Sequence, residues 1–511
     1  MEMTLGTILQ ITASKHPERE GLIFEDARAS YSALNERVNQ RANALLKMGI
    51  SRKDHVATLA PNCMELVETI FAVWRIGAVL VPLNMRLSPG EMHYIIEHSD
   101  VTVLLFTDRF QETIHQIKPT LKKVRKFVSF NNPPSPGFDD FEVLTNGQGA
   151  DVPPVGVIEN DPATILYTSG TTGKPKGVVA THKNWVWACA NASFLKSQNA
   201  PIKNLTVYPL FHAGSIINLC GSIFGGNPLV ILKEFDPQIM LEQIQKEKVQ
   251  RMGNPPTVYN MILQHPDIQK YDLSSVIYLN SGAEVMPNET RKRLSRVFVN
   301  AGFVDNYGMT ETCGNTTSRS EEYTEAKPYS VGIPGITNQV RVVNSKGQDT
   351  TPGEVGEIIV RGPNVMQEYY KDPEKTAEAI RGGWLYTDDL GKMDEDGFLM
   401  IVERKKNMII SGGENIYPKE VEDVLYRHPK VVDAAVYGVP DKIWGEKVCA
   451  AIVLKAGEQM TVEEIIDFSK QNLASFKKPK FVEFIDALPR NTIGKVQRSE
   501  LKQKFTENKS E

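Results

Sequence analysis

Hydroxyl, glycine and lysine residues are concentrated in one segment that follows the apolar residues 163–166. The segment reads Tyr167-Thr168-Ser169-Gly170-Thr171-Thr172-Gly173-Lys174-Pro175-Lys176-Gly177. Glycines let the backbone approach a ligand, while inward N–H groups, hydroxyls and lysines suit phosphate oxygens. The spacing is not that of a Walker loop. A flexible surface loop is the alternative, but so dense a set of polar groups favours a phosphate-binding loop.

Further segments, in a fixed order along the chain, hold charged and polar groups suited to nucleotide chemistry. They are Ser281-Gly282-Ala283-Glu284, Asn306-Tyr307-Gly308-Met309-Thr310-Glu311, Tyr386-Thr387-Asp388-Asp389-Leu390, Arg404-Lys405-Lys406 and Pro489-Arg490-Asn491-Thr492-Ile493-Gly494-Lys495. Taken singly, they read as turns, loops or solvated charge runs. Together with the loop, they resemble the motifs of the adenylate-forming superfamily, which includes acyl-CoA synthetases, luciferases and peptide-synthetase adenylation domains. The resemblance extends to Arg498 and covers nearly the whole chain.

The resemblance implies a set of residues that bind ATP or AMP. They are Thr168, Ser169, Gly170, Thr171, Thr172, Gly173, Lys174, Lys176, Gly282, Ala283, Glu284, Asp305, Asn306, Tyr307, Asp389 and Arg404. In this family Tyr307 would stack near adenine and Asp389 would bind both ribose hydroxyls. Glu311 and Thr168 would hold Mg²⁺, and a carboxylate suits this hard cation beside triphosphate oxygens.

The same resemblance assigns catalytic roles to Lys495, Thr310, Glu311 and His212. A carboxylate that attacks the α-phosphate brings two anions together, and the ammonium of Lys495 would bridge them. His212, in the segment Tyr208-Pro209-Leu210-Phe211-His212-Ala213-Gly214, matches a histidine at the mouth of the acyl tunnel. A general-base role is disfavoured, because the substrate carboxylate is already ionised at pH 7.

Three further groups of residues follow from the resemblance. The acyl pocket would be formed by His212, Asn306 and Gly308, and the hinge would lie at Lys406. Coenzyme A would contact Gly412, Gly413 and Trp444.

The chain departs from the family at positions where glycine is common, namely Asn306, Glu368, Asp388 and Glu403. The carboxylates of Asp388 and Glu403 would either repel phosphate or point to solvent. The Asn306 side chain would narrow the acyl pocket and favour a short or medium acid with a polar group, because unpaired buried amide groups are costly. Alternatively, this side chain turns away into a local turn.

The pattern of elements predicts an α/β fold, because short apolar strands alternate with helical segments. Helical spacing within 63–78 precedes a buried strand at 78–83. A helix at 237–248 precedes strands at 276–279 and 303–304. Residues 131–156 are predicted to be a surface connection. A chain of 511 residues is too long for one core. We expect a large multi-layer N-terminal domain at 1–403, a hinge at 404–406 and a mobile lid at 407–511.

The C-terminal segment has its own composition. About a third of the residues from Arg404 onward are charged, against about a fifth before it, which favours a smaller separate domain. Strands at 431–437, 450–454 and 481–485, a helix at 462–473 and a terminal helix make this domain a small α+β lid.

Composition and charge exclude several functional classes. A net charge of −4 and a pI near 6.2 disfavour nucleic acid as a partner. The N-terminus lacks signal-peptide features, and Glu65, Glu68 and Arg75 interrupt the most apolar run, at 64–83, so no integral membrane segment is expected. The five cysteines are scattered without CxxC spacing, which favours reduced thiols in the cytoplasm.

The sequence therefore predicts an AMP-forming acyl-CoA synthetase that uses ATP, Mg²⁺ and coenzyme A, as in fatty acid metabolism. A carboxylic acid would become an acyl-adenylate, with release of pyrophosphate, and then a thioester. The alternatives are a free-standing enzyme that loads a carrier protein, a luciferase-like oxygenase and a non-catalytic relative. Aliphatic, aromatic and hydroxylated acids all remain open. Base rates among soluble enzymes favour a homodimer.

Overall fold

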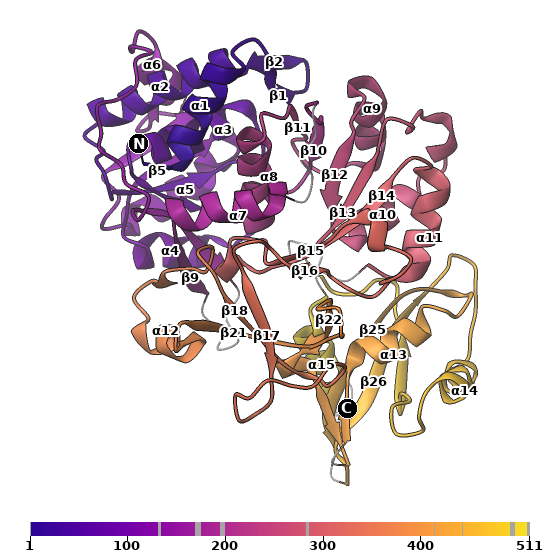
Figure 1. Cartoon of the computed structure of the whole chain (residues 1–511). Coiled ribbons are helices and arrows are strands. Elements are labelled where there is room, and N and C mark those ends of the chain that lie inside the picture. Colours follow the sequence, from indigo (N-terminus) through magenta and orange to yellow (C-terminus); the bar gives the residue numbers. More distant parts are fainter. Residues whose placement is uncertain are drawn as a thin grey trace.

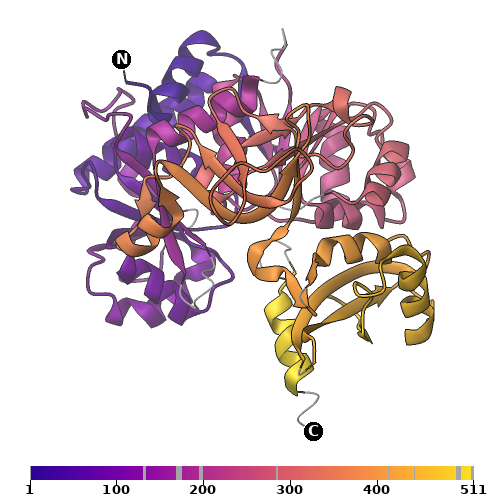
Figure 2. The same cartoon turned by 60° about the horizontal axis from the view of Figure 1, so that its bottom comes forward.

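The computed structural model describes residues 2–130, 134–168, 175–194, 200–282, 286–412, 414–441, 443–490 and 496–507. Within this part of the chain the strands form four sheets, here called A to D (Figure 1). The predicted α/β fold is confirmed: a large N-terminal part contains sheets A, B and C, and a small C-terminal part contains sheet D. Figure 2 shows the C-terminal part, in orange and yellow, beside the rest of the molecule.

Sheet A has the strand order β16-β15-β14-β13-β12-β10-β11-β1-β2. Its strands are β1 (Glu20–Phe24), β2 (Ala27–Ser30), β10 (Asn204–Thr206), β11 (Leu229–Ile231), β12 (Arg251–Asn254), β13 (Tyr278–Ser281), β14 (Gly302–Tyr307), β15 (Thr317–Arg319) and β16 (Ile333–Pro334). The pairs from β1 through β11, β10, β12 and β13 to β14 are parallel, and the edge pairs are antiparallel.

Sheet B has the order β19-β9-β8-β4-β3-β5-β6-β7. Its strands are β3 (His55–Leu59), β4 (Val79–Pro82), β5 (Val101–Thr107), β6 (Lys126–Phe130), β7 (Asp139–Asp140), β8 (Pro162–Thr168), β9 (Lys176–Thr181) and β19 (Glu368–Tyr369). The pairs from β8 to β7 are parallel, whereas β8 and β9 pair antiparallel and so return the chain after the loop that follows Thr168.

Alternate residues of these strands face different cores, which places helices between the sheets. Leu22 and Leu229 of sheet A and Val56 and Leu80 of sheet B belong to one buried cluster. The same cluster includes side chains of the helices α1 (Leu5–Lys15), α2 (Tyr31–Lys47), α3 (Met64–Arg75), α7 (His182–Phe194) and α8 (Ala213–Phe224). Because strand side chains alternate between faces, neighbouring residues belong to clusters on the outer faces. The result is a stack of helix, sheet, helix, sheet and helix layers.

The outer helices complete these layers. The outer face of sheet A packs against α9 (Pro237–Glu247), α10 (Pro256–Leu263) and α11 (Asn288–Val297), and that of sheet B against α4 (Pro89–His98) and α5 (Gln111–Ile117).

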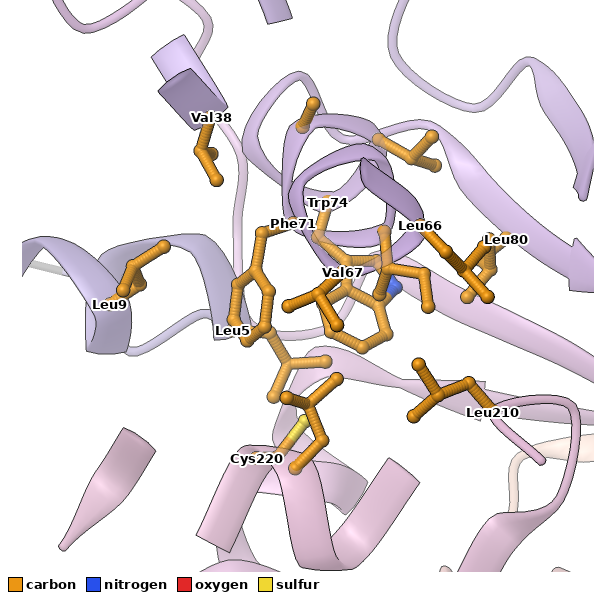
Figure 3. Close-up of a cluster of buried hydrophobic side chains, with 14 of the residues drawn as sticks. Leu5, Leu9, Val38, Leu66, Val67, Phe71, Trp74, Leu80, Leu210 and Cys220 are labelled. Carbon is orange, nitrogen blue, oxygen red and sulfur yellow. The ribbon is translucent and has the colours of Figure 1, made fainter. Parts of the chain in front are cut away.

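Helix α3 lies at the centre of the inner layer (Figure 3). The Trp74 indole N–H donates to Ala163 O at 2.9 Å, and the Trp74 and Phe71 rings meet edge to face at 5.1 Å. Glu68, which interrupts the apolar run, is buried and pairs with Arg41 at 2.8 Å. Within the described ranges, no helix has both the length and the apolar character needed to cross a membrane.

Sheets C and D form the remaining layers. Sheet C contains β17 (Gln339–Val343), β18 (Gly356–Arg361), β20 (Ile380–Arg381), β21 (Trp384–Met393) and β22 (Leu399–Arg404), with α12 (Pro373–Ala379) beside it. Sheet D contains β23 (Ile409–Ser411), β24 (Glu414–Ile416), β25 (Val431–Asp441), β26 (Gly445–Leu454) and β27 (Phe481–Phe484). Helices α13 (Pro418–Leu425), α14 (Val462–Asn472) and α15 (Arg498–Glu507) pack on sheet D.

One interpretation of the sequence was incomplete. Residues 131–156 were expected to be only a surface connection, but their described part contains β7 and the short helix α6 (Phe141–Thr145). Phe141 is fully buried, and the Asp140 side chain caps the helix by accepting from the backbone N–H of Glu142 at 2.9 Å. A single buried aromatic residue therefore anchors a segment whose Pro, Gly and Asn content reads as loop.

Candidate active site

A cavity of about 580 Å³ lies where β8, β12 and β13 end. Predicted site residues that line it are Thr168, Lys176, His212, Gly282, Asn306, Gly308, Thr310, Glu311, Arg404 and Lys406. We call it the nucleotide cavity. Its position agrees with a general property of α/β proteins, in which ligands bind at the carboxyl ends of parallel strands.

Tyr307, Asp389 and Arg404 form a hydrogen-bonded group beside this cavity. The Tyr307 hydroxyl donates to Asp389 Oδ2 at 2.8 Å, and Arg404 Nε lies 2.9 Å from Asp389 Oδ1. The strand register explains the second contact, because Asp389 of β21 pairs directly with Arg404 of β22. Burial and the Asp389 carboxylate raise the pKa of Tyr307, so the phenol stays protonated and keeps its donor role. The Asp389 carboxylate is thus held in one orientation.

Glu311 lies on the other side of the nucleotide cavity. It is the second residue of the short helical turn η4 (Thr310–Thr312), and its Oε1 accepts from the Tyr369 hydroxyl at 2.8 Å. The ammonium of Lys176 lies 4.4 Å from the centroid of the Tyr369 ring. Lys176 and Thr168 are register partners on β9 and β8. Carboxylate, hydroxyl and ammonium groups therefore surround one end of the cavity.

The imidazole of His212 is neutral. Burial lowers its pKa to about 3, with a further contribution from Arg86. His212 precedes α8 and lines the nucleotide cavity, and no hydrogen-bond partner for its buried Nε2 is found among the described residues. A neutral ring with a free nitrogen is suited to position a ligand by a hydrogen bond.

The C-terminal part contributes to a second cleft, which adjoins the nucleotide cavity. Tyr307, Gly308 and Asp389 line this cleft together with Arg490 and Val496. Arg490 and Val496 form an antiparallel bridge. The two described residues that flank positions 491–495 therefore face the Tyr307–Asp389 pair.

Residues 9–370 match the family of AMP-binding enzymes, and residues 420–495 match the AMP-binding enzyme C-terminal domain. The chain belongs to the AMP-binding enzyme family.

Relatives and solved structures support this assignment along the whole chain. Feruloyl-CoA synthase of Amycolatopsis sp is 36% identical over 480 residues, covering 93% of this chain and 94% of the relative. Indoleacetate–CoA ligase of Aromatoleum aromaticum is 34% identical over 503 residues, covering 98% of each. The Bacillus subtilis o-succinylbenzoate CoA synthetase, in complex with its acyl-adenylate, superposes with a TM-score of 0.86 at 30% identity over 98% of each chain. The enzyme is an AMP-forming acid–thiol ligase, and its ATP-dependent reaction proceeds in two steps through an acyl-adenylate.

Several predicted residues lie elsewhere than in the nucleotide cavity. Asp305 was expected to bind nucleotide, but its carboxylate forms ion pairs with the buried guanidinium groups of Arg291 and Arg319. It points to the opposite face of β14 from Asn306, because strand neighbours alternate. Gly412 and Trp444 contact each other in the C-terminal part and do not line the cavity.

The other predicted residues fall outside the described part of the chain. They are Ser169, Gly170, Thr171, Thr172, Gly173, Lys174, Ala283, Glu284, Gly413 and Lys495.

The structure explains two of the departures from glycine. Asp388 has a φ of 58°, in the left-handed region that glycine adopts without strain, and this exposed residue lines the nucleotide cavity. Glu403 does not line the nucleotide cavity. Its Oε1 accepts from the Arg404 backbone N–H at 2.7 Å and from Asn407 Nδ2 at 3.0 Å. Asp388 thus replaces a glycine preferred for backbone reasons, and Glu403 stabilises the turn around Lys406.

Some residues of the site were not identified from the sequence, and Tyr369 is the clearest case. It links Glu311 and Lys176, yet it lies in a two-residue strand within a segment that shows no motif. Asn218, Asn254 and Asn280 also line the nucleotide cavity. Alternation of polar and apolar residues in β12 and β13 was the available signal.

Gly308 is the most constrained glycine of the cavity wall, and Gly308→Ala is expected to impair the enzyme. A Cβ atom there would lie 2.6 Å from the backbone carbon and oxygen of Gly314, so the chain beside Tyr307 must shift. We expect a loss of about 1–3 kcal/mol in the free energy of unfolding and a raised KM for ATP. The matched control is Gly282→Ala, since Gly282 lines the same cavity and its Cβ would meet nothing within 4 Å. Equal effects of the two substitutions, measured by thermal unfolding and ATP saturation, would contradict this.

Proposed function

We propose that the enzyme is a Mg²⁺- and ATP-dependent acyl-CoA synthetase whose adenylate is held by Asp389, Tyr307 and Arg404. The observation that supports this most directly is the hydrogen-bonded group formed by these three residues. Tyr307 contacts one oxygen of Asp389 and Arg404 the other, and a carboxylate with two lone-pair sites on each oxygen is suited to accept from ribose hydroxyls as well. The Tyr307 phenol and the Arg404 guanidinium orient the carboxylate for this role.

The polyphosphate would lie toward Lys176 and the residues that follow Thr168. Five cationic side chains line this cavity, against three carboxylates, Glu311, Glu378 and Asp388; the cations are Lys176, Lys375, Arg381, Arg404 and Lys406. Partial desolvation and the nearby charge of Arg404 lower the pKa of Lys406, as expected where positive charges gather. Such a cavity favours a polyanion.

Glu311 and Thr168 fit a magnesium ion that accompanies ATP. Both offer oxygen atoms at the wall of the nucleotide cavity, and the Tyr369 hydroxyl occupies only one carboxylate oxygen of Glu311. Hard cations prefer oxygen ligands. When bound, the ion would neutralise phosphate charge, while Tyr369 fixes the direction of the Glu311 carboxylate.

Coenzyme A is the proposed acyl acceptor, with Gly412, Gly413 and Trp444 as candidate contacts. Trp444 is about half exposed, and the Lys480 ammonium lies 4.3 Å from its ring centroid. An exposed aromatic surface beside a cation is suited to a nucleotide-containing ligand. The five cysteines are buried as thiols, which supports a reducing compartment, and we place the enzyme in the cytoplasm.

The test is product analysis with ATP, Mg²⁺, CoA and a panel of carboxylic acids. We expect AMP, pyrophosphate and a CoA thioester in equal amounts. Formation of ADP would contradict an adenylate mechanism. AMP release that requires a carrier protein in place of CoA would contradict the proposed acceptor.

A further inference from the structure

A second cavity, of about 430 Å³, extends from the nucleotide cavity between α8 and the inner face of sheet A. The two cavities share the lining residues Ile217, Asn218, Asn280, Asn306 and Gly314. We call the second one the acyl cavity, because an acid whose carboxylate faces the nucleotide would extend into it. This placement rests on the proposed function.

The inner face of sheet A is polar along this cavity. Arg251, Asn280 and Asn306 line it from three successive parallel strands, β12, β13 and β14. Their strand neighbours Met252 and Leu279 belong to the apolar cluster on the outer face. The alternation that builds a dry core on one side of these strands therefore presents arginine and amide groups on the other.

The helix that covers this face contributes polar side chains beside one apolar side chain, Ile217. Asn218 and Ser222 of α8 line the acyl cavity, and Gly221 presents no side chain. Ser222 Oγ accepts from Asn204 Nδ2 at 2.9 Å, and the Ser318 hydroxyl donates to Asn306 Oδ1 at 2.7 Å. An alkyl chain would lie against these polar groups and would offer no hydrogen bond to the buried Asn280 Oδ1, for which the described residues provide no partner, and this is unfavourable.

Charge in the acyl cavity is of one sign. Arg19 and Arg251 line it, and His16 lies beside Arg19 at its outer end. Among the described residues that line the cavity there is no aspartate or glutamate. A cavity with this lining attracts an anion.

Arg251 has no ion-pair partner within the described ranges. Its guanidinium lies 5.4 Å from the ring centroid of Tyr278, and its Nε is buried without a hydrogen-bond acceptor. Burial lowers the pKa of Arg251, while Tyr278 and the Glu321 carboxylate oppose that shift. Asn280 Oδ1, on the next strand, is likewise buried without a described partner. A buried guanidinium without a counter-ion is stabilised when an anion pairs with it.

The register of strands β12, β13 and β14 indicates how long the ligand is. Asn280 lies one strand and two residues from Arg251, and Asn306 lies one further strand and two further residues along. Strand spacing and rise place the backbones of Arg251 and Asn306 about 16 Å apart. Strand side chains stand roughly perpendicular to the sheet and shorten this span only where they lean along it, so the ligand on this scale is an extended acid of medium chain length.

We propose that Arg251 binds a second carboxylate at the distal end of the acyl substrate, so that the enzyme activates dicarboxylic acids in preference to monocarboxylic acids of the same length. One carboxylate faces the nucleotide and reacts, and the other pairs with the guanidinium. Arg251 is then a specificity-determining residue, and Asn280 and Asn306 are polar contacts along the chain between the two ends.

The experiment measures acid-dependent pyrophosphate release with octanoate, octanedioate and 8-hydroxyoctanoate. The last of these has a polar but uncharged group at its distal end. For the wild type we expect kcat/KM for octanedioate to exceed that for octanoate by about 10-fold or more. In Arg251→Met this ratio is expected to fall to one or below, with octanoate activity retained. Arg251→Lys is expected to give an intermediate ratio, since it keeps the charge and loses the planar fork.

The matched control is Arg341→Met. Arg341 also lies on a strand with its guanidinium near an aromatic ring, 5.2 Å from the Trp384 centroid, but it is distant from the acyl cavity. This substitution should leave the ratio unchanged. If Arg251→Met does not fold, the wild-type ratio and Arg251→Lys decide.

The outcomes separate this inference from the proposed function. A wild type that prefers octanoate or 8-hydroxyoctanoate, or a ratio that Arg251→Met and Arg251→Lys leave unchanged, overturns the dicarboxylate proposal while acid activation stands. Absence of pyrophosphate release with every acid, in a folded wild type, instead overturns the proposed function and this inference with it.

Discussion

Lys495→Ala is expected to slow adenylate formation by about 10²–10³-fold or more, while thioester formation from a preformed acyl-adenylate stays largely intact. The reason is electrostatic: the carboxylate and the α-phosphate are both anions, and a positioned cation stabilises the charge that develops between them. Only the first half-reaction contains that encounter. The measurements are acid-dependent pyrophosphate release and, separately, thioester formation from synthetic acyl-AMP and CoA.

Residues around Lys495 support this proposal, although Lys495 itself lies outside the described part of the chain. Arg490 and Val496 line the same cleft as Tyr307 and Asp389. The Arg490 guanidinium pairs with Asp433 at 2.6 Å, which ties the start of the segment to β25. The control is Lys470→Ala, an exposed lysine of α14 paired with Asp467. Equal loss in both half-reactions would contradict the assignment to adenylation.

Much of the fold could be predicted because local sequence and burial agree. The helical spacing expected within 63–78 corresponds to the shorter helix α3, the strand expected at 78–83 to β4 (Val79–Pro82), and the C-terminal pattern to β25, β26, α14 and β27. The strand expected at 276–279 begins two residues later, at Tyr278. The side chains on the two faces of this strand differ in polarity, so the run of apolar residues alone did not locate the first residue of the strand.

The site was predicted less completely, and the misses have a common cause. A motif assigns a role to a stretch of residues, whereas a strand directs alternate side chains to opposite faces. Asp305 and Asn306 are adjacent in the motif, yet Asp305 pairs with Arg291 and Asn306 lines both cavities. Arg251 escaped notice for the same reason, because β12 is only four residues long and its alternation is too short to recognise in isolation.

The side chain of Asn306 shows what tertiary structure adds. The sequence left open whether it enters the acyl pocket or bonds within its own turn. In the structure it lines both cavities, and its Oδ1 accepts from Ser318 on the neighbouring strand. Its amide nitrogen is thereby directed by a residue twelve positions away, which sequence spacing does not reveal.

A small set of hydrogen bonds and ion pairs holds the segment around Lys406 in its observed conformation. Lys406 is the middle residue of the turn η6 (Lys405–Asn407), which follows β22 directly. The Met408 backbone N–H donates to Arg404 O at 3.2 Å, and the Lys405 ammonium pairs with Glu357 of β18 at 3.0 Å. The Glu403 carboxylate adds hydrogen bonds to Arg404 and Asn407, and rotation about Lys406 would require this small set of contacts to break.

Lys406→Pro is therefore expected to abolish CoA thioester formation and to leave adenylate formation within about an order of magnitude of the wild type. A hinge must absorb a large change in φ and ψ, and proline fixes φ near −65°. The proposal is that the C-terminal part turns about Lys406 between the two half-reactions, and proline would trap the adenylating arrangement. The measurements are acid-dependent ATP–pyrophosphate exchange for the first step and thioester yield for the second. Lys406→Ala is the matched control, because it removes the same ammonium and leaves φ free, so it should retain both steps, with no more than a raised KM for ATP. Normal overall ligation by the proline variant would place the rotation at another residue, and loss of both steps in the alanine variant would show that the ammonium, not the backbone, matters at this position.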